Sequence, residues 1–376
     1  MFTLYGALAA TSLAALLAVT CAVLLRKGAG YSTFIRFAVL CIPFAFIGSR
    51  VAFCLSNLSY YLETISMPEM MLHVQDGGAS MTGALCGVLL SALIAAKWAK
   101  QPAGLILDAA ALGMPLALII ERLAEPLCEM GLGKYFQSTA FDFMYDLAGG
   151  MHPVFAYEAI AACIIGLVLV LHFGRRTMRS GDLMGCFLVL YGCTQPVLES
   201  LRNDGHMKVI HFVRVNQVAA IVMVVAVLIV WSIRCCKHNC KKETIMTWVT
   251  AIVCIGLGVV QEFAADGDEN PYFSLTLVSG LLAAALVIVC VCWFFVWKKH
   301  GKSAAAIPCV AIVATSLLLI ERTMDTGTHR LFFVYGIMAA NLYIIGHMAF
   351  ALRRLADEAH KAQLAEKYHL DPPLTK

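Results

Sequence analysis

Charged side chains inside long apolar stretches are the residues of this sequence most able to do chemistry. Because an ionisable group within a membrane-spanning helix costs about 2.5–3.5 kcal/mol on insertion scales, each one is by default a candidate for a functional site. These residues are Arg50, Glu121, Arg122, Glu158, Glu199 and Arg202. In the topology derived below they all fall in the outer half of the membrane, which favours a shared polar cavity. Several cations around one cavity suit an anion, and in a membrane the commonest anion is a lipid phosphate.

Each of these residues also has a purely structural interpretation. Glu199 and Arg202 are three positions apart on a predicted helix and could simply neutralise each other. Arg50 could hold a loop carbonyl, and His152, which precedes Pro153, could only cap a helix. A site without function would require all of these structural interpretations to hold at once. The structural explanation of the whole set is therefore weaker than that of any single residue.

Glycines are concentrated at the predicted outer mouth of the third apolar stretch. The segment DGGASMTGALCG, residues 76–87, contains Gly77, Gly78, Gly83 and Gly87. Glycine there either permits close helix packing or lets backbone N–H groups approach a phosphate. Gly131 and Gly133 repeat the pattern in the next outer loop. The sequence leaves both roles open.

The elements that position these residues are predicted to be transmembrane helices. The chain has 376 residues, of which 60% are hydrophobic and 14% charged, against roughly 25% charged in a soluble domain. A bilayer core of ~30 Å needs about 20 apolar residues per helix, and about eleven such stretches occur. They cover, roughly, residues 2–25, 34–55, 79–98, 104–123, 153–173, 183–201, 215–233, 246–265, 272–297, 304–321 and 331–352. The runs are too long, and alternate too little, for a β-barrel.

The positions of Lys and Arg predict the orientation, because short cytoplasmic loops accumulate cations. Every second joint is basic, beginning with Arg26 and Lys27 and ending with Arg353 and Arg354. We therefore predict an N-terminus outside and a C-terminus in the cytoplasm. The net charge of +4 then reflects topology and not nucleic-acid binding. The first stretch has no cation before it and no convincing cleavage site, so we interpret it as a permanent span.

Most of the 15 cysteines lie singly in apolar stretches, where Cys behaves as a small hydrophobe. Only Cys235, Cys236 and Cys240 cluster in a polar joint, with His238 between them. Thiols at a helix end are the favoured interpretation and palmitoylation is the alternative. Tetrahedral ligand spacing is missing from the sequence, so we predict no metal site there.

In chain order, these segments resemble the motifs of the prolipoprotein diacylglyceryl transferase family of bacterial membranes. That family carries a GxR segment, an acidic-Gly-Gly then Ser-Phe-His-Gly-Gly-Leu stretch, a Gly-Arg-Ile-Gly-Asn-Phe signature, a His-Pro-x-x-x-Tyr-Glu segment, a Tyr-Gly followed by Glu-x-x-Arg, and a late Gly-Gln. The counterparts are Gly48 with Arg50, DGGASMTGAL, ERLAEP with Arg122, HPVFAYE with His152, Tyr157 and Glu158, Tyr191-Gly192 with Glu199 and Arg202, and Asn216-Gln217. Order and spacing agree over about residues 1–234.

The sequence departs from the family pattern at several motif positions. The exchanges are Thr82 for histidine, Glu125 for asparagine, Glu121 for glycine, Gln195 for arginine and Met130 for glutamate. Glu129 is adjacent to the last of these. The arginines expected to face a phosphate are kept, whereas proposed acid–base and positioning groups are exchanged.

The resemblance implies transfer of the diacylglyceryl group of phosphatidylglycerol to the lipobox cysteine of prolipoprotein signal peptides, with release of glycerol phosphate. The site would lie in the bacterial cytoplasmic membrane among membrane lipids, with no nucleic-acid partner. A thiolate displaces the phosphate at carbon, so the reaction needs charge neutralisation and a base. No metal and no other cofactor is expected.

The same resemblance assigns roles to individual residues. The catalytic candidates are Arg122, Arg202 and Glu199, the arginines as bidentate phosphate ligands and Glu199 as the first choice of base, ahead of Glu125, Glu129 and His152. The substrate-binding candidates are Gly78, Gly83, Glu125, Gly133, His152, Tyr157, Glu158 and Arg50.

The fold class expected is therefore an all-α integral membrane protein with about eleven transmembrane helices. Its parts would be a seven-span transferase-like domain over 1–234, a basic cytoplasmic joint over 235–243, about four additional spans over 244–353 and a cytoplasmic tail over 354–376. Two other functions stay open. A catalytically degenerate relative would bind lipid or lipoprotein without turnover. A transporter would need polar groups at the membrane midplane.

Overall fold

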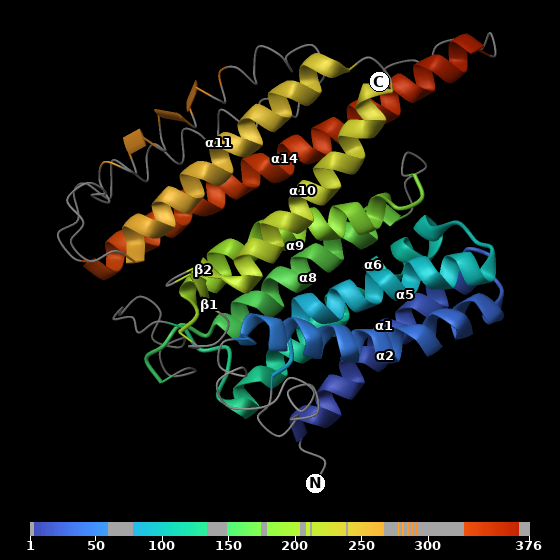
Figure 1. Cartoon of the computed structure of the whole chain (residues 1–376), viewed down its shortest axis with the longest axis horizontal. Coiled ribbons are helices and arrows are strands. Elements are labelled where there is room, and N and C mark those ends of the chain that lie inside the picture. Colours follow the sequence, from blue (N-terminus) through green and yellow to red (C-terminus); the bar gives the residue numbers. More distant parts are fainter. Residues whose placement is uncertain are drawn as a thin grey trace. The chain divides into compact units, whose positions relative to one another are not determined.

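The computed structural model describes residues 4–58, 78–133, 149–173, 179–203, 208–210, 213–237, 240–266 and 327–367, with single residues between 277 and 291. The regular secondary structure of these residues is helical apart from one short pair of strands. The elements, shown in Figure 1, are α1 (Leu4–Arg26), α2 (Tyr31–Ser56), α5 (Met81–Ala99), α6 (Ala103–Ala124), η2 (Glu125–Cys128), α8 (Val154–Phe173), α9 (Asp182–Leu201), β1 (Lys208–Ile210), β2 (Val213–Arg214), α10 (Val215–Cys236), α11 (Lys241–Asp266) and α14 (Gly327–Lys367). The prediction of a helical membrane protein is confirmed.

Six helices of the described part are long and apolar enough to cross a bilayer: α1, α2, α5, α6 with η2, α8 and α10. Helices α9, α11 and α14 coincide with three further predicted spans without being among those six. The predicted spans 272–297 and 304–321 fall on residues that the structure describes only singly or not at all. The total of about eleven spans stays a prediction.

The chain divides into two compact units. The first comprises Met1–Tyr191 with Leu198–Ala219, and the second comprises Gly192–Val197 with Ala220–Lys376. Most of α10 therefore groups with the C-terminal helices. The predicted domain limits at 234, 243 and 353 stay predictions.

In the first unit, α2 packs along α5, α1 along α6, and α6 along α8. Glycines allow the α2–α5 contact: a Cβ atom added to Gly83 would overlap the carbonyl oxygen of Gly48, and one added to Gly87 would overlap that of Phe44. Small residues let membrane helices approach closely, because packing replaces the hydrophobic driving force that lipid does not supply. Of the two roles left open for these glycines, the structure shows close packing at Gly83 and Gly87.

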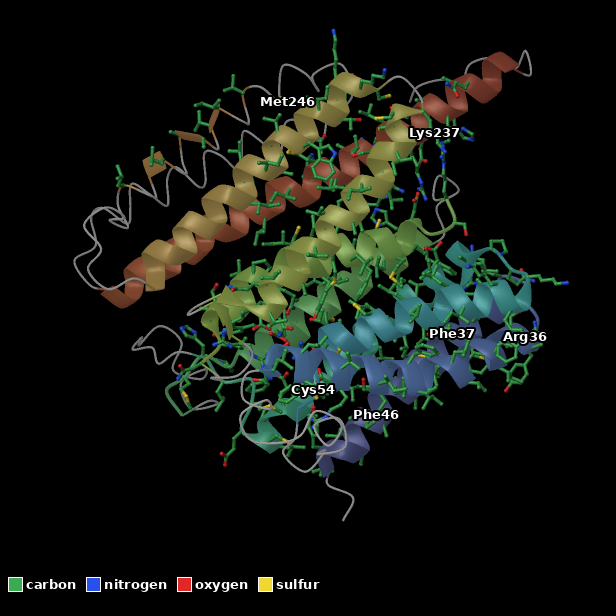
Figure 2. The ribbon with its side chains drawn as sticks, viewed as in Figure 1. Arg36, Phe37, Phe46, Cys54, Lys237 and Met246 are labelled. Atoms are coloured by element: carbon green, nitrogen blue, oxygen red, sulfur yellow. The ribbon has the colours of Figure 1, made fainter. Side chains whose placement is uncertain are left out.

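The opposite face of α2 carries large apolar side chains. Phe37 is fully buried, whereas Phe46 on the same helix is 63% exposed (Figure 2). A helix that is apolar on all sides suits burial in a bilayer, because lipid covers the face that protein does not. Together with the six apolar helices, this exposure identifies a multi-pass membrane protein.

The start of α9 is held by a residue that sequence analysis did not single out. Asp108 of α6 accepts hydrogen bonds from the backbone N–H groups of Gly181, at 2.8 Å, and Met184, at 3.1 Å. An acidic side chain at a helix N-terminus satisfies amide groups that have no partner within the helix. Asp108 thereby fixes α9 against α6, and the far end of α9 carries Glu199.

In the second unit, α11 packs on α14, and Trp248 of α11 donates to Ser232 of α10 at 2.9 Å. The Cys235 thiol is buried and donates to the carbonyl oxygen of Leu352 at 3.3 Å, while Cys236 is exposed. Within the described ranges, no three His, Cys, Asp or Glu side chains are grouped in a way that could hold a metal ion. His238 lies outside those ranges.

Candidate active site

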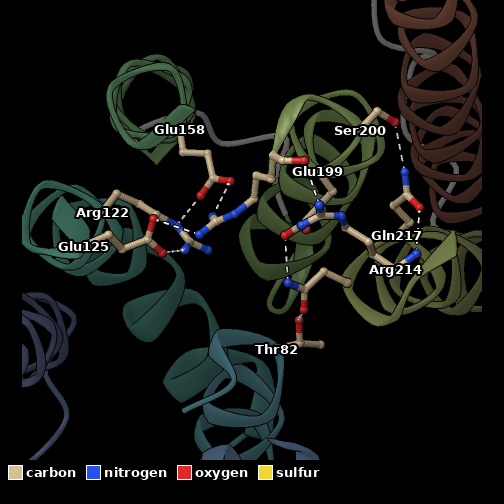
Figure 3. Close-up of polar contacts among 10 residues, drawn as sticks. Thr82, Arg122, Glu125, Glu158, Glu199, Ser200, Arg214 and Gln217 are labelled. Atoms are coloured by element: carbon tan, nitrogen blue, oxygen red, sulfur yellow. Dashed lines mark hydrogen bonds and ion pairs between the residues drawn. The ribbon is translucent and has the colours of Figure 1, made fainter. Parts of the chain in front are cut away.

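Two arginines and two glutamates of the first unit form a closed ring of ion pairs (Figure 3). Arg122 of α6 pairs through Nη1 with Glu125 and through Nε with Glu158. Arg202, directly after α9, pairs through Nη1 with Glu158 Oε1 and through Nη2 with Glu125 Oε2, each at 3.1 Å. The four side chains are 1–8% exposed. Each carboxylate therefore bridges the same two guanidinium groups.

Local structure explains why these groups meet. Arg122 and Glu125 are three residues apart where α6 continues into η2, so their side chains leave the same helix face. Glu158 lies one turn into α8, which packs on α6. Glu121 adds a third carboxylate, whose Oε2 lies 3.7 Å from Arg122 Nε. Three predicted spans thus bring these charged side chains together, and that they face the outer side of the membrane stays a prediction.

The loop after η2 holds Arg202 in place. Gly133 pairs with Arg202 in an isolated β-bridge, and the Gly133 N–H donates to the His152 carbonyl oxygen at 2.7 Å. A Cβ atom added to Gly133 would lie 2.6 Å from the Leu201 carbonyl oxygen, so only glycine fits there. Gly133 thus packs its backbone beside the arginine, and its substrate-binding role stays a prediction.

His152 is buried at the entrance to α8, with Nδ1 3.4 Å from the Tyr157 hydroxyl oxygen. Burial lowers the pKa of His152 below its ordinary value, because the charged ring loses hydration. The neutral imidazole is favoured there, which leaves one ring nitrogen able to accept a proton.

A second polar chain runs beside the ion-pair ring. Thr82 at the start of α5 donates to Asn216 Oδ1 at 2.9 Å, and Asn216 Nδ2 donates to Glu199 Oε1 at 2.7 Å (Figure 3). The other oxygen of Glu199 lies 3.9 Å from Arg214 Nη1. Glu199 is 2% exposed. Glu199 therefore contacts α10 and the segment before it, in contrast to the alternative in which it simply neutralises Arg202 along one helix.

Arg214 is the functional candidate that sequence reasoning missed. Its Nη2 donates to the Arg202 carbonyl oxygen at 2.6 Å, and its backbone N–H donates to Gln217 Oε1 at 3.0 Å. Gln217 Nε2 in turn donates to Ser200 Oγ at 3.0 Å. A signal was available, because an arginine in a loop predicted to be outside runs against the cytoplasmic bias of cations.

Arg50 and Gly78 form a contact where α2 ends and α5 begins. Arg50 is 5% exposed, and its Nη1 donates to the Gly78 carbonyl oxygen at 3.2 Å. Gly78 has a positive φ of 93°, and an added Cβ would overlap the Phe53 ring. This hydrogen bond to a loop carbonyl is the structural interpretation considered above for Arg50. The substrate-binding role of Arg50 and Gly78 stays a prediction.

The fold and the site together define a class: a helical, multi-pass membrane protein with a buried arginine–carboxylate centre near one end of its spans. The family model of prolipoprotein diacylglyceryl transferase matches residues 2–233, more than half of the chain. The chain belongs to this family.

Individual relatives agree with the family assignment. The chain is 30% identical to a phosphatidylglycerol–prolipoprotein diacylglyceryl transferase of Symbiobacterium thermophilum over 220 residues, 53% of this chain and 76% of the relative. It is 27% identical to proteins of the same name from Halalkalibacterium halodurans, over 56% of this chain and 75% of the relative, and from Clostridioides difficile, over 58% and 86%. The matched region contains every residue of the ion-pair ring.

Proposed function

We propose that this chain transfers the diacylglyceryl group of phosphatidylglycerol to a cysteine sulfhydryl of prolipoproteins. The observation that carries the proposal is the convergence of the buried guanidinium groups of Arg122 and Arg202 on shared, two-oxygen anionic partners. The same geometry suits a phosphate ester, because a guanidinium group binds phosphate through two parallel N–H donors. The names of the relatives supply the donor lipid and the acceptor protein.

The proposed step is a displacement at carbon. The cysteine thiolate attacks the glycerol carbon that carries the phosphate ester, the C–S bond forms, and the C–O bond to phosphate breaks. The electron pair departs with the glycerol phosphate, and a base has taken the thiol proton. Arg122 and Arg202 stabilise the charge that grows on the departing phosphate, an effect that is strongest where water is excluded.

Glu199 is the proposed base. Asn216 holds one of its carboxylate oxygens, and Thr82 extends the chain of hydrogen bonds to the position where the family motif has histidine. The chain of polar contacts therefore links that motif position to a carboxylate instead of an imidazole. Glu125 and Glu158 are less suited to accept a proton, because each already bridges two guanidinium groups.

The membrane setting follows from the same proposal. The basic joints support an outer-facing site in the cytoplasmic membrane of a bacterium, with the N-terminus outside and the C-terminus in the cytoplasm. The acceptor would be the lipobox cysteine of a signal peptide, which enters the site from the membrane. The proposed function concerns the part of the chain up to about residue 234 and assigns no role to the predicted spans after it.

The test is complementation of a bacterial strain depleted of its own transferase, together with transfer to a lipobox peptide by the purified chain with phosphatidylglycerol in detergent. We expect growth to be restored and the peptide to gain the mass of a diacylglyceryl group. A matched control, Arg36→Lys, alters an arginine that donates to the Trp98 carbonyl oxygen, and should leave transfer intact. The proposal would be refuted if the unsubstituted chain neither restored growth nor transferred the diacylglyceryl group to the peptide.

One observation favours a lipid-binding relative without turnover as the second candidate. Glu121 and Glu125 stand where the family signature has glycine and asparagine, and both lie beside Arg122. Their carboxylates reduce the positive charge available to a phosphate. Binding of phosphatidylglycerol by a parent protein that transfers nothing would select this candidate.

A further inference from the structure

Glu125 occupies the place that the proposed function gives to the lipid phosphate. Its two oxygens lie on different guanidinium groups, Oε1 on Arg122 Nη1 and Oε2 on Arg202 Nη2 at 3.1 Å. A phosphate ester held between the same arginines would use the same donors. We propose that Glu125 is a tethered competitor of the anionic lipid, so that the affinity of the site for phosphate is set by displacement of its carboxylate. This inference rests on the proposed function.

The charge balance of the site makes displacement necessary. With all groups ionised, Arg122 and Arg202 face the three carboxylates of Glu121, Glu125 and Glu158, which leaves a formal charge of −1. A phosphodiester brought to the same donors adds a second negative charge in a site of low dielectric, where like charges repel more strongly than in water. A carboxylate must leave the arginines before the phosphate can be held.

Glu125 is the carboxylate placed to leave. Glu158 lies within the 20-residue helix α8, so several helical turns hold its backbone. Glu125 begins the four-residue helix η2, which is followed by two residues in the left-handed conformation, Glu129 with a φ of 56° and Gly131 with a φ of 78°. The family signature has a neutral asparagine at the position of Glu125. The additional charge is therefore a departure of this chain from the family signature.

The experiment compares lipid binding by the full-length parent and Glu125→Gln in detergent micelles. The probes are phosphatidylglycerol and diacylglycerol, which share acyl chains and differ in the phosphate headgroup. We expect Glu125→Gln to bind phosphatidylglycerol about tenfold more tightly or better, and diacylglycerol as the parent does. Glu358→Gln removes one exposed charge from α14 and should change neither affinity.

Two results would overturn the inference. Phosphatidylglycerol binding that is unchanged or weaker in Glu125→Gln would show that the carboxylate does not compete. An equal gain for both lipids would show that the substitution only loosens the pocket. If Glu125→Gln does not yield folded protein, Glu125→Asp carries the test, because the shorter side chain cannot reach both arginines; a parent-like affinity then refutes the inference.

The outcome is distinguishable from failure of the proposed function. A chain that transfers no diacylglyceryl group in any variant, but gains phosphatidylglycerol affinity in Glu125→Gln, loses its enzymatic assignment and keeps the competing carboxylate. A chain that transfers the group, with no change of affinity in Glu125→Gln, keeps the enzymatic assignment and loses the competitor.

Discussion

Replacement of Arg202 by lysine separates a phosphate clamp from a charge that only neutralises its neighbours. Arg202 reaches Glu158 with Nη1 and Glu125 with Nη2, each at 3.1 Å, from a side chain that is 8% exposed. Lysine keeps the positive charge but presents one ammonium group, so it can satisfy one of the two directions. The substitution therefore removes one charge-assisted contact on the bound anion.

The size of the effect follows from that lost contact. A hydrogen bond to a charged group contributes about 1.5–3 kcal/mol, and 1.36 kcal/mol corresponds to a factor of ten, so we expect a loss of about 10- to 150-fold in kcat/KM. Because the departing phosphate gains charge in the transition state, the fall in turnover should exceed the fall in lipid binding. The assay measures transfer to a lipobox peptide and phosphatidylglycerol binding side by side.

A double substitution tests the competing explanation. If Arg202 merely neutralised Glu199, changing both to Gln should be milder than changing either alone. The structure pairs Glu199 with Asn216 and Arg214, so the double variant should be at least as impaired as Arg202→Gln. Full activity of Arg202→Lys, or a rescue in the double variant, would refute the clamp.

Three further outcomes can be checked. Gly83→Ala should cost about 1–3 kcal/mol, because the new Cβ overlaps the Gly48 carbonyl oxygen, whereas Gly256→Ala, with nothing within 4 Å, should melt like the parent in detergent. In whole cells carrying single-cysteine variants, an impermeant maleimide should label exposed Cys128 and leave exposed Cys236 unlabelled; the reverse pattern would invert the predicted topology. Burial lowers the pKa of His152 in the folded protein below its ordinary value of 6.5. The neutral His152 therefore contributes its full stability at pH values above the pKa of the unfolded chain, and that stability is lost as the pH falls through the pKa of the folded protein. His152→Gln should therefore lose less thermal stability than the parent on acidification, and identical pH profiles would contradict this.

Much of the candidate site could be predicted from residues that conflict with their surroundings. Arg122, Glu158 and Arg202 each place a charge within or at one end of an apolar stretch, where charge is costly without a partner. That conflict is visible in the sequence, and the structure brings the three side chains into one ring. Asp108 shows no such conflict in the sequence, because a single acidic residue near the start of a helix is common. Its role is visible only once the backbone N–H groups of Gly181 and Met184 are located beside it.

The partners within the site could not be predicted from the sequence. Glu199 and Arg202 are close along the chain, and helical spacing favours their pairing. Because α9 ends at Leu201 and Arg202 takes an extended conformation, the arginine turns toward Glu125 and Glu158 instead. Gly83 likewise fitted either packing or phosphate binding, and only the position of Gly48 on the neighbouring helix shows that it packs closely there.

The sequence by itself determined that the chain is a membrane protein and which charged residues are costly to place in the bilayer. It also determined which family has its motifs in the same order. Those properties depend on the transfer of individual side chains from water to lipid, and that cost is set by residue type and local run length. The tertiary structure alone decided that Glu125 bridges Arg122 and Arg202 while Arg214 faces Glu199. An ion pair forms where separate segments place opposite charges within reach, and that distance depends on how α6, α8 and the segment after α9 pack together.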